Sequence, residues 1–279
     1  MHASNNHAAV VRHKPVRQWL TPTSGYLTGY THTLNPYIGC DFACSYCYVR
    51  RMPPALFRGI PWGEWVDVKE VAPHRFAAEL ARKKSKGPVR IFMSSATDPY
   101  QRLEAKEHVT RSLLEVMAAD PPEFLLIQTR SPLVTRDLEL IRQLLPHVRV
   151  SMTIETDRED VRRAFTPGTP PLAARIEACR AVRKADVPLQ VAVSPLLPCT
   201  DRFAEQLAGL DADRIVLDDF FMGDGSGGKR TRQLGLQPIF AELGAEQWFD
   251  PTAYLHVHAQ LKDVLPEDKL YVSQPGFLP

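Results

Sequence analysis

Residues 35–50, NPYIGCDFACSYCYVR, place Cys40, Cys44 and Cys47 within eight positions. This C-x3-C-x2-C spacing lets one short loop offer three thiolates to a cubane iron–sulfur cluster, because thiolates are the usual ligands of such clusters. The loop has no fourth thiolate, so one iron would stay open to a small molecule that receives an electron. The alternatives are a zinc site completed by a histidine such as His32, or reduced structural thiols. Zinc sites more often carry paired C-x2-C elements, and no second pair exists here.

The two remaining cysteines, Cys179 and Cys199, lie far downstream of this loop. The chain has an odd number of cysteines, five, and three of them lie close together. This pattern argues against a disulfide framework and favours a reducing compartment. Cys179 falls on a stripe of apolar residues at helical spacing, so we expect it to be a small buried hydrophobe. Two spare cysteines are too few for a second cluster.

Length and composition allow one large domain or two small ones, since the 279 residues are 44% hydrophobic. The 34 basic and 32 acidic residues give a formal charge of +2, so no chain-wide field attracts nucleic acid or anionic lipid. Any nucleic-acid binding must therefore be local. No apolar run is long enough to span a bilayer. The first 20 residues lack the charged segment followed by an apolar segment that is typical of a secretory signal. We expect a cytoplasmic protein.

Short β-rich runs alternate with amphipathic stretches from residue 31 onward, which is typical of βα units around a parallel sheet. The six expected strands are Thr31–Leu34, Val89–Ser94, Glu123–Thr129, Val148–Thr153, Leu189–Val193 and Arg214–Asp218. Between them, three stripes at helical spacing should face the sheet. Their members are Val109, Leu113, Val116 and Met117; Leu138, Ile141 and Leu145; and Leu172, Ile176, Cys179 and Val182.

The expected organisation has three parts: a mobile tail and lead-in over residues 1–30, a core over 31–221, and a closing segment over 222–279. The last part opens with GDGSGGKRTR at 223–232, where backbone amides and Lys229, Arg230 and Arg232 could bind an anion. This loop lacks P-loop spacing, and a flexible lid is its alternative. Helices and a last strand should follow, within Gln237–Phe249, Thr252–Leu265 and Leu270–Ser273.

The cysteine spacing, with aromatic Tyr46 directly before the last cysteine, resembles the radical S-adenosylmethionine (SAM) superfamily. The resemblance implies a full or partial (β/α) barrel, which agrees with the alternation of strand-like and helix-like stretches. We therefore expect an α/β fold, namely a partial (β/α)6 barrel. The cysteine loop should follow the first strand, and a C-terminal α/β extension should complete the chain. The resemblance also implies a [4Fe–4S] cluster whose open iron binds SAM. One electron then yields methionine and a 5′-deoxyadenosyl radical that abstracts a substrate hydrogen. A reductant protein such as flavodoxin or ferredoxin would be a partner.

Three further stretches resemble the spore photoproduct lyase-like branch: residues 96–117, 126–141 and 149–156. By this resemblance, Thr97 and Asp98 lie near the cofactor, and Arg130 and Thr153 bind its methionine carboxylate, with Tyr46 beside them. These positions lie at strand ends, which collect on the catalytic face of a parallel barrel. The ordinary alternatives are a turn at Asp98, a surface charge at Arg130 and a plain strand residue at Thr153.

Two more residues are candidates for cofactor binding. Glu155 points to the same side of the strand as Thr153 and could bind ribose hydroxyls, or else lie on a solvated rim. Arg175 could reach back to the cofactor from its helix, or form a surface salt bridge.

Tyr48 and Cys199 are the candidate catalytic residues. The branch uses a tyrosine in the place of Tyr48 for radical transfer, and the alternative is packing of the loop. The branch also carries a hydrogen-donating cysteine where this chain has Ser95. A serine O–H bond is far stronger than a thiol S–H bond, so Tyr48 or Cys199 must donate instead, or the reaction ends differently.

The substrate is open at this point. Residues 50–65, RRMPPALFRGIPWGEW, mix arginines with Phe57, Trp62 and Trp65, a composition typical of surfaces that stack bases, and also of a loop packed on a barrel. A DNA lesion or nucleotide-like substrate is the first candidate, and a small metabolite or peptide is the second. The alternative from another class is a metal- or cluster-binding module without radical chemistry.

Overall fold

The computed structural model describes residues 9–223 and 226–279, and its main feature is an eight-stranded sheet in the order β11-β10-β9-β8-β7-β6-β3-β2. All neighbouring strands run parallel except β2 and β3. The bounds are β2 (Leu20–Pro22), β3 (His32–Leu34), β6 (Arg90–Met93), β7 (Phe124–Thr129), β8 (Val148–Thr153), β9 (Leu189–Val193), β10 (Arg214–Leu217) and β11 (Leu270–Val272). The predicted α/β fold, a partial parallel barrel, is confirmed.

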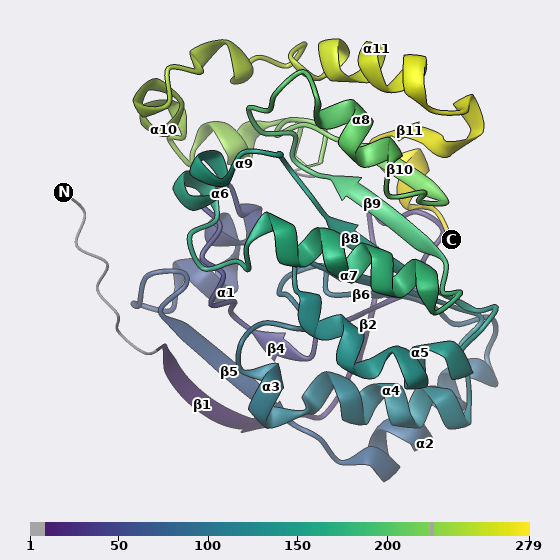
Figure 1. Cartoon of the computed structure of the whole chain (residues 1–279). Helices are drawn as coiled ribbons and strands as arrows, with labels where there is room; N and C mark the ends of the chain where they lie inside the picture. The colour runs from purple at the N-terminus through teal and green to yellow at the C-terminus, as the bar shows by residue number, and fades with distance from the viewer. Residues whose placement is uncertain (1–8, 224–225) are drawn as a thin grey trace.

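The six predicted strands are all present, and β8 and β9 have the predicted bounds. The last predicted strand is β11, which pairs with β10 and thereby extends the same sheet. Helices α4, α5 and α7 lie over one face of the sheet (Figure 1). The helices are α1 (Pro53–Leu56), α2 (Pro73–Lys84), α3 (Glu104–Glu107), α4 (Val109–Ala119), α5 (Leu138–Gln143), α6 (Glu159–Phe165), α7 (Leu172–Lys184), α8 (Phe203–Ala208), α9 (Lys229–Arg232), α10 (Gln237–Glu242) and α11 (Tyr254–Val264). Short 3-10 turns are η1 (Tyr48–Arg51), η2 (Pro132–Asp137), η3 (Glu246–Trp248), η4 (Glu267–Lys269) and η5 (Gln274–Phe277).

The core lies between the sheet and these helices, and the predicted stripes supply much of it. Leu113, Ile141 and Cys179 are fully buried there, which confirms the interpretation of Cys179 as a core residue. Leu145 is exposed, contrary to the prediction, because α5 ends at Gln143 and the helical spacing stops with it. None of the described helices is long and apolar enough to cross a membrane.

The expectation of a mobile stretch before the first strand is wrong for residues 10–15. There β1 (Val10–Pro15) runs parallel to β5 (Trp65–Glu70), and β4 (Tyr37–Ile38) pairs with the other edge of β5. All six residues of β1 are exposed, so the strand has no apolar alternation that a sequence pattern could reveal. Residues 1–8 of that predicted tail, and residues 224–225 of the predicted basic loop, lie outside the described residues.

Candidate functional site

The cysteine loop (residues 39–47) follows β3 and β4, with Cys40 and Cys44 buried and Cys47 partly buried. Burial raises the pKa of all three thiols, that of Cys44 to about 11. After burial, Asp98 and then Cys44 raise the pKa of Cys40. Arg130 lowers the pKa of Cys44 and Cys47 raises it, so the three thiols are close enough to interact electrostatically. Within the described part of the chain, no three His, Cys, Asp or Glu side chains converge as the ligands of one metal ion do. Three thiols from one loop are a donor set that fits a cubane, which offers each cysteine a different iron.

Two glycines shape the backbone of this loop. Gly39 has a φ of +88°, and a Cβ at this position would lie 2.6 Å from the carbonyl oxygen of Trp65. Gly168 comes from the distant segment before α7, and a Cβ there would lie 2.5 Å from the carbonyl oxygen of Asp41. Any larger residue at either position would therefore displace the cysteine loop.

Arg50 holds the loop from its far end. It donates from Nε to the carbonyl oxygen of Cys44 over 2.8 Å, and from Nη2 to that of Ala43 over 2.7 Å. Sequence reasoning missed this role, because it considered Arg50 only as part of a stretch that could form either a nucleic-acid surface or a loop packed on the barrel. An arginine three residues past the last cysteine was the available signal, but its partners are backbone carbonyls, which leave no trace in a sequence.

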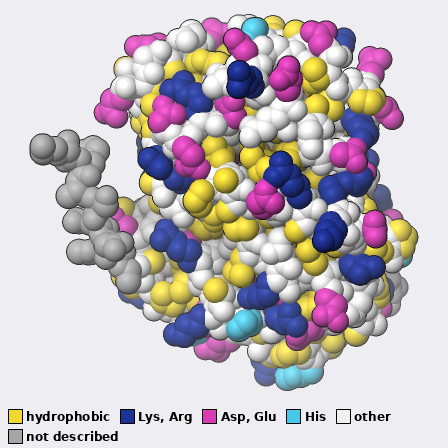
Figure 2. Space-filling model, in the orientation of Figure 1, with side chains coloured by type: hydrophobic (Ala, Val, Ile, Leu, Met, Phe, Trp, Pro, Cys, Tyr) yellow, Lys and Arg dark blue, Asp and Glu magenta, His cyan; other side chains and the backbone are white. Residues whose placement is uncertain are grey.

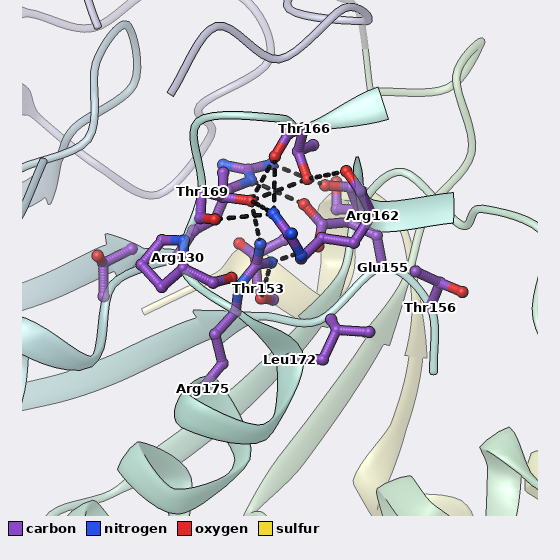
Figure 3. Close-up of polar contacts among 12 residues, drawn as sticks. Arg130, Thr153, Glu155, Thr156, Arg162, Thr166, Thr169, Leu172 and Arg175 are labelled. Atoms are coloured by element: carbon purple, nitrogen blue, oxygen red, sulfur yellow. Dashed lines mark hydrogen bonds and ion pairs between the residues drawn. The ribbon is translucent and has the colours of Figure 1, made fainter. Parts of the chain in front are cut away.

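Beside the cysteine loop, Glu155 collects three partners from distant parts of the chain. Its Oε1 accepts hydrogen bonds from the Tyr46 hydroxyl (2.5 Å) and from Arg130 Nε (2.8 Å). Its Oε2 accepts from Arg175 Nη1 at 2.7 Å. Figure 3 shows Arg130, which directly follows β7, and Arg175 of α7 meeting Glu155 just past the end of β8. We call Tyr46, Arg130, Glu155 and Arg175 the carboxylate network.

The network contains two guanidinium groups and one carboxylate. Burial alone would raise the pKa of Glu155, but Arg175 and Arg130 outweigh burial and hold this pKa below its usual value. Burial is the main cause that raises the pKa of Tyr46 well above its usual range. Tyr46 therefore stays a neutral donor to a charged Glu155, which is 1% exposed and not a solvated rim residue.

Arg175 is enclosed by protein, so the surface salt bridge considered for it is wrong. Its side chain is 0% exposed and also donates to the hydroxyl of Thr169 and the carbonyl oxygens of Thr153 and Pro170. Because these partners fix its guanidinium from several sides, Arg175 braces Glu155.

Asp98 lies between the cysteine loop and the end of β7. Its carboxylate accepts from the Thr129 hydroxyl (2.7 Å) and from the backbone N–H groups of Arg130 (2.8 Å) and Tyr100 (2.9 Å). Burial raises its pKa, and it in turn raises the pKa of Cys40. Asp98 thus orients the backbone from which Arg130 projects, close to the first cysteine.

Thr97 and Thr153 both touch the candidate site through their hydroxyls. Thr97 donates to the carbonyl oxygen of Gly39 over 2.6 Å, which ties the segment after β6 to the cysteine loop. The Thr153 hydroxyl accepts from Gln128 Nε2 at 2.6 Å. The predicted cofactor-binding residues therefore gather around one end of the parallel sheet, as the strand-end argument required.

The two predicted catalytic residues occupy different surroundings. The Tyr48 hydroxyl donates to the carbonyl oxygen of Ser95, so Tyr48 and Ser95 lie next to each other. Cys199 is partly buried, and burial followed by Asp157 and Asp201 raises its pKa. Burial, together with these acidic neighbours, keeps Cys199 a thiol rather than a thiolate.

The sequence leaves two alternatives for the stretch at 50–65, a surface that stacks bases or a loop packed on the barrel. Trp62 and Trp65 are buried and pack edge to face with ring centroids 5.8 Å apart. Arg58 lies over the ring of Trp65 and forms an ion pair with Asp67. Only the loop-packing alternative fits these three residues, while Phe57 is exposed. On the face drawn in Figure 2, Lys and Arg side chains are interspersed with Asp and Glu.

Comparison with known proteins points to one family. The model of the Radical SAM superfamily matches residues 34–208. Uncharacterized proteins of Methanocaldococcus jannaschii and of Mycobacterium tuberculosis are each 32% identical to the chain, over 64% and 61% of its length. These matches cover 64% and 50% of the relatives, so the chain matches less than two thirds of their length.

Among solved structures, the fold is similar to that of spore photoproduct lyase complexed with a dinucleoside spore photoproduct. The TM-score is 0.64 at 17% identity, over 94% of this chain and 81% of that one. A variant of that lyase with bound SAM and the dinucleoside gives the same TM-score at 18% identity.

Proposed function

Because this chain belongs to the radical SAM superfamily, we propose that Cys40, Cys44 and Cys47 hold a [4Fe–4S] cluster and that SAM binds at the remaining iron. The bound pair would supply reductive cleavage of SAM and hydrogen abstraction from a substrate. One observation carries the proposal: Tyr46, from within the cysteine loop, is hydrogen-bonded to Glu155, which Arg130 and Arg175 also bind. The cysteine loop and the strand ends thus form one site.

Arg130 is the residue we assign to the methionine carboxylate of SAM. Its Nε and Nη2 atoms donate to Glu155 and to the carbonyl oxygen of Ser194, and within the described residues Nη1 donates to no protein group. A guanidinium that two hydrogen bonds hold in place, and whose Nη1 has no protein acceptor, suits a carboxylate ligand. Glu155 holds Arg130 in place, and Arg175 holds Glu155. Thr97, Asp98 and Thr153 complete the proposed cofactor site.

The proposed substrate is nucleotide-like, and the proposed electron donor is a flavodoxin or ferredoxin. Support for the substrate is the likeness to a lyase whose structure contains a dinucleoside, together with the features developed in the next subsection. Tyr48, held at Ser95, is the proposed participant in radical transfer, and Cys199 is the second candidate.

Anaerobic reconstitution with iron and sulfide, followed by SAM and dithionite, tests this function. We expect about four irons per chain and formation of 5′-deoxyadenosine. The matched control is Cys179→Ala, because Cys179 lies in the core under the helices. A wild-type protein that holds the cluster but never releases 5′-deoxyadenosine would be a cluster-binding module, and the proposal would be wrong.

A further inference from the structure

A row of uncharged polar side chains crosses the face of the sheet that points away from the helices. Gln128 of β7 pairs with Ser151 of β8, and Ser151 pairs with Gln190 of β9. Their strand neighbours Ile127 and Val191 belong to the core under the helices, so the alternation of strands puts the polar residues on the opposite face. Ser151 and Gln190 are fully buried, and Gln128 is partly exposed. We call these three residues the polar row.

Hydrogen bonding in the polar row is incomplete. Gln128 Nε2 donates to Thr153, and Gln190 Nε2 donates to the Ser151 hydroxyl over 3.0 Å. The Oε1 atoms of both glutamines are buried and, within the described residues, accept no hydrogen bond. The Ser94 hydroxyl, at the end of the neighbouring strand β6, is also buried without such a partner.

Buried polar atoms without a partner are costly. Each buried polar group without a partner costs about 1–3 kcal/mol, and native proteins keep few of them. The conclusion does not depend on how the amide ends are assigned, because exchanging O and N at Gln128 or Gln190 leaves the other end unpaired. Unpaired groups that lie together in one row are available to a ligand or to water molecules.

The surroundings of the row define the chemistry of that ligand. Toward the amino ends of the strands, Phe92 and Leu126 pack with Tyr30. Arg149 pairs with Leu126 across the strands and Arg214 pairs with Gln190, and both guanidinium groups donate to the carbonyl oxygen of Leu278. Toward the carboxyl ends lies the carboxylate network, joined to the row through Thr153, which contacts both Gln128 and Arg175. The three residues of the row carry no charge, so they suit a neutral group that has hydrogen-bonding atoms of its own. Glutamine amides are well matched to the edges of nucleobases.

We propose that the polar row is the floor of the substrate site and binds the hydrogen-bonding edge of a nucleobase. The inference deepens the proposed function, on which it rests for the chemistry that takes place above the row. It assigns Gln128, Ser151 and Gln190 to substrate specificity. Gln128 and Ser151 precede Arg130 and Thr153 by two residues each. The polar row therefore lies nearer the amino ends of the strands than the residues assigned to SAM.

Calorimetric titration and thermal unfolding of the reconstituted full chain test this, with SAM saturating and each of the four deoxynucleosides as probe. At least one deoxynucleoside should bind and raise the Tm. The variant is Ser151→Ala/Gln190→Leu, which removes both partners of one bond, and the control is Gln206→Leu on the exposed side of α8. The double variant should bind at least about tenfold more weakly, with a Tm in the absence of nucleoside equal to or above that of the wild type.

Three results would overturn the inference. They are the absence of any Tm shift with all four probes, a shift of equal size in the double variant, and a Tm of the double variant several degrees below that of the control. Measuring 5′-deoxyadenosine on the same preparation separates this inference from the proposed function. Nucleoside binding without SAM cleavage contradicts only the proposed function, and SAM cleavage without nucleoside binding contradicts only the polar row.

Discussion

The Tyr46 hydroxyl lies 2.5 Å from Oε1 of Glu155, although the two residues are 109 positions apart in the chain. This bond connects the cysteine loop to the end of β8. Arg130 and Arg175 bind the same carboxylate, so a movement of β7 or α7 would displace Glu155 and, through Tyr46, the cysteine loop. The network therefore sets the position of the loop relative to the sheet before any cofactor binds.

Glu155→Gln should strongly destabilise the fold. The substitution leaves Arg130 and Arg175 without their buried counter-ion, and breaking a buried pair in this way costs about 3–5 kcal/mol. The matched control is Glu177→Gln, whose ion pair with Arg180 is exposed and is worth about 0–1 kcal/mol. Urea unfolding measures both. Equal free energies of unfolding for the two variants would show that the network does not hold the loop.

Single changes of Cys40, Cys44 or Cys47 to Ala should remove most of the cluster iron and all SAM cleavage. Three thiolates are the minimum with which this loop can hold a cube, because the chain offers no spare cysteine beside it. Iron and acid-labile sulfide are measured after anaerobic reconstitution. Iron content that survives all three changes would contradict the assignment, as would a clear excess over one cluster in the wild type.

Asp218, which follows β10, should make stability fall as pH rises. Burial, followed by Asp219, raises the pKa of Asp218 to about 7. The folded protein then keeps a proton that the unfolded chain loses near pH 4, so the free energy of unfolding decreases between about pH 4 and pH 7. Asp218→Asn removes this penalty, which is on the order of 4 kcal/mol at pH 8. Its Tm should match the wild type at pH 4 and exceed it at pH 8. A difference that is independent of pH would refute the raised pKa.

The wild-type protein should not repair the thymine spore photoproduct efficiently. By the resemblance to spore photoproduct lyases, Ser95 takes the place of the cysteine that quenches the product radical, and a serine hydroxyl cannot donate hydrogen in the same way. The assay counts turnovers of the purified dinucleotide lesion by the reconstituted protein. Ser95→Cys is the matched variant, and it should raise the yield of repaired thymine pairs. Many clean turnovers by the wild type would contradict this prediction.

The fold was largely predictable from periodicity. Alternating strand and helix patterns located all six core strands, because each strand is buried and each helix presents one apolar side to it. The pattern failed where packing does not impose periodicity. Strand β1 is exposed along its whole length and is held by backbone pairing with β5, so its residues show no alternation.

The candidate site was predictable only residue by residue. Spacing found the three cysteines. The resemblance to the lyase-like branch supplied Asp98 and Arg130, and the strand-end argument supported placing them and Glu155 at one edge of the sheet. That argument could not show that Arg130 pairs with Glu155, because a sequence does not say which strand-end charges face each other. The close approach of Gly168 to the cysteine loop is likewise a tertiary contact without a local signal.

The central claim is that SAM binds the open iron beside the carboxylate network, and electron paramagnetic resonance of the reduced cluster tests it most directly. Spectra are recorded with and without SAM for the wild type and for Arg130→Gln, after both are shown to contain equal iron. The account predicts that SAM changes the wild-type spectrum and that the variant needs a much higher SAM concentration for the same change. A wild-type spectrum that is identical with and without SAM would contradict the account.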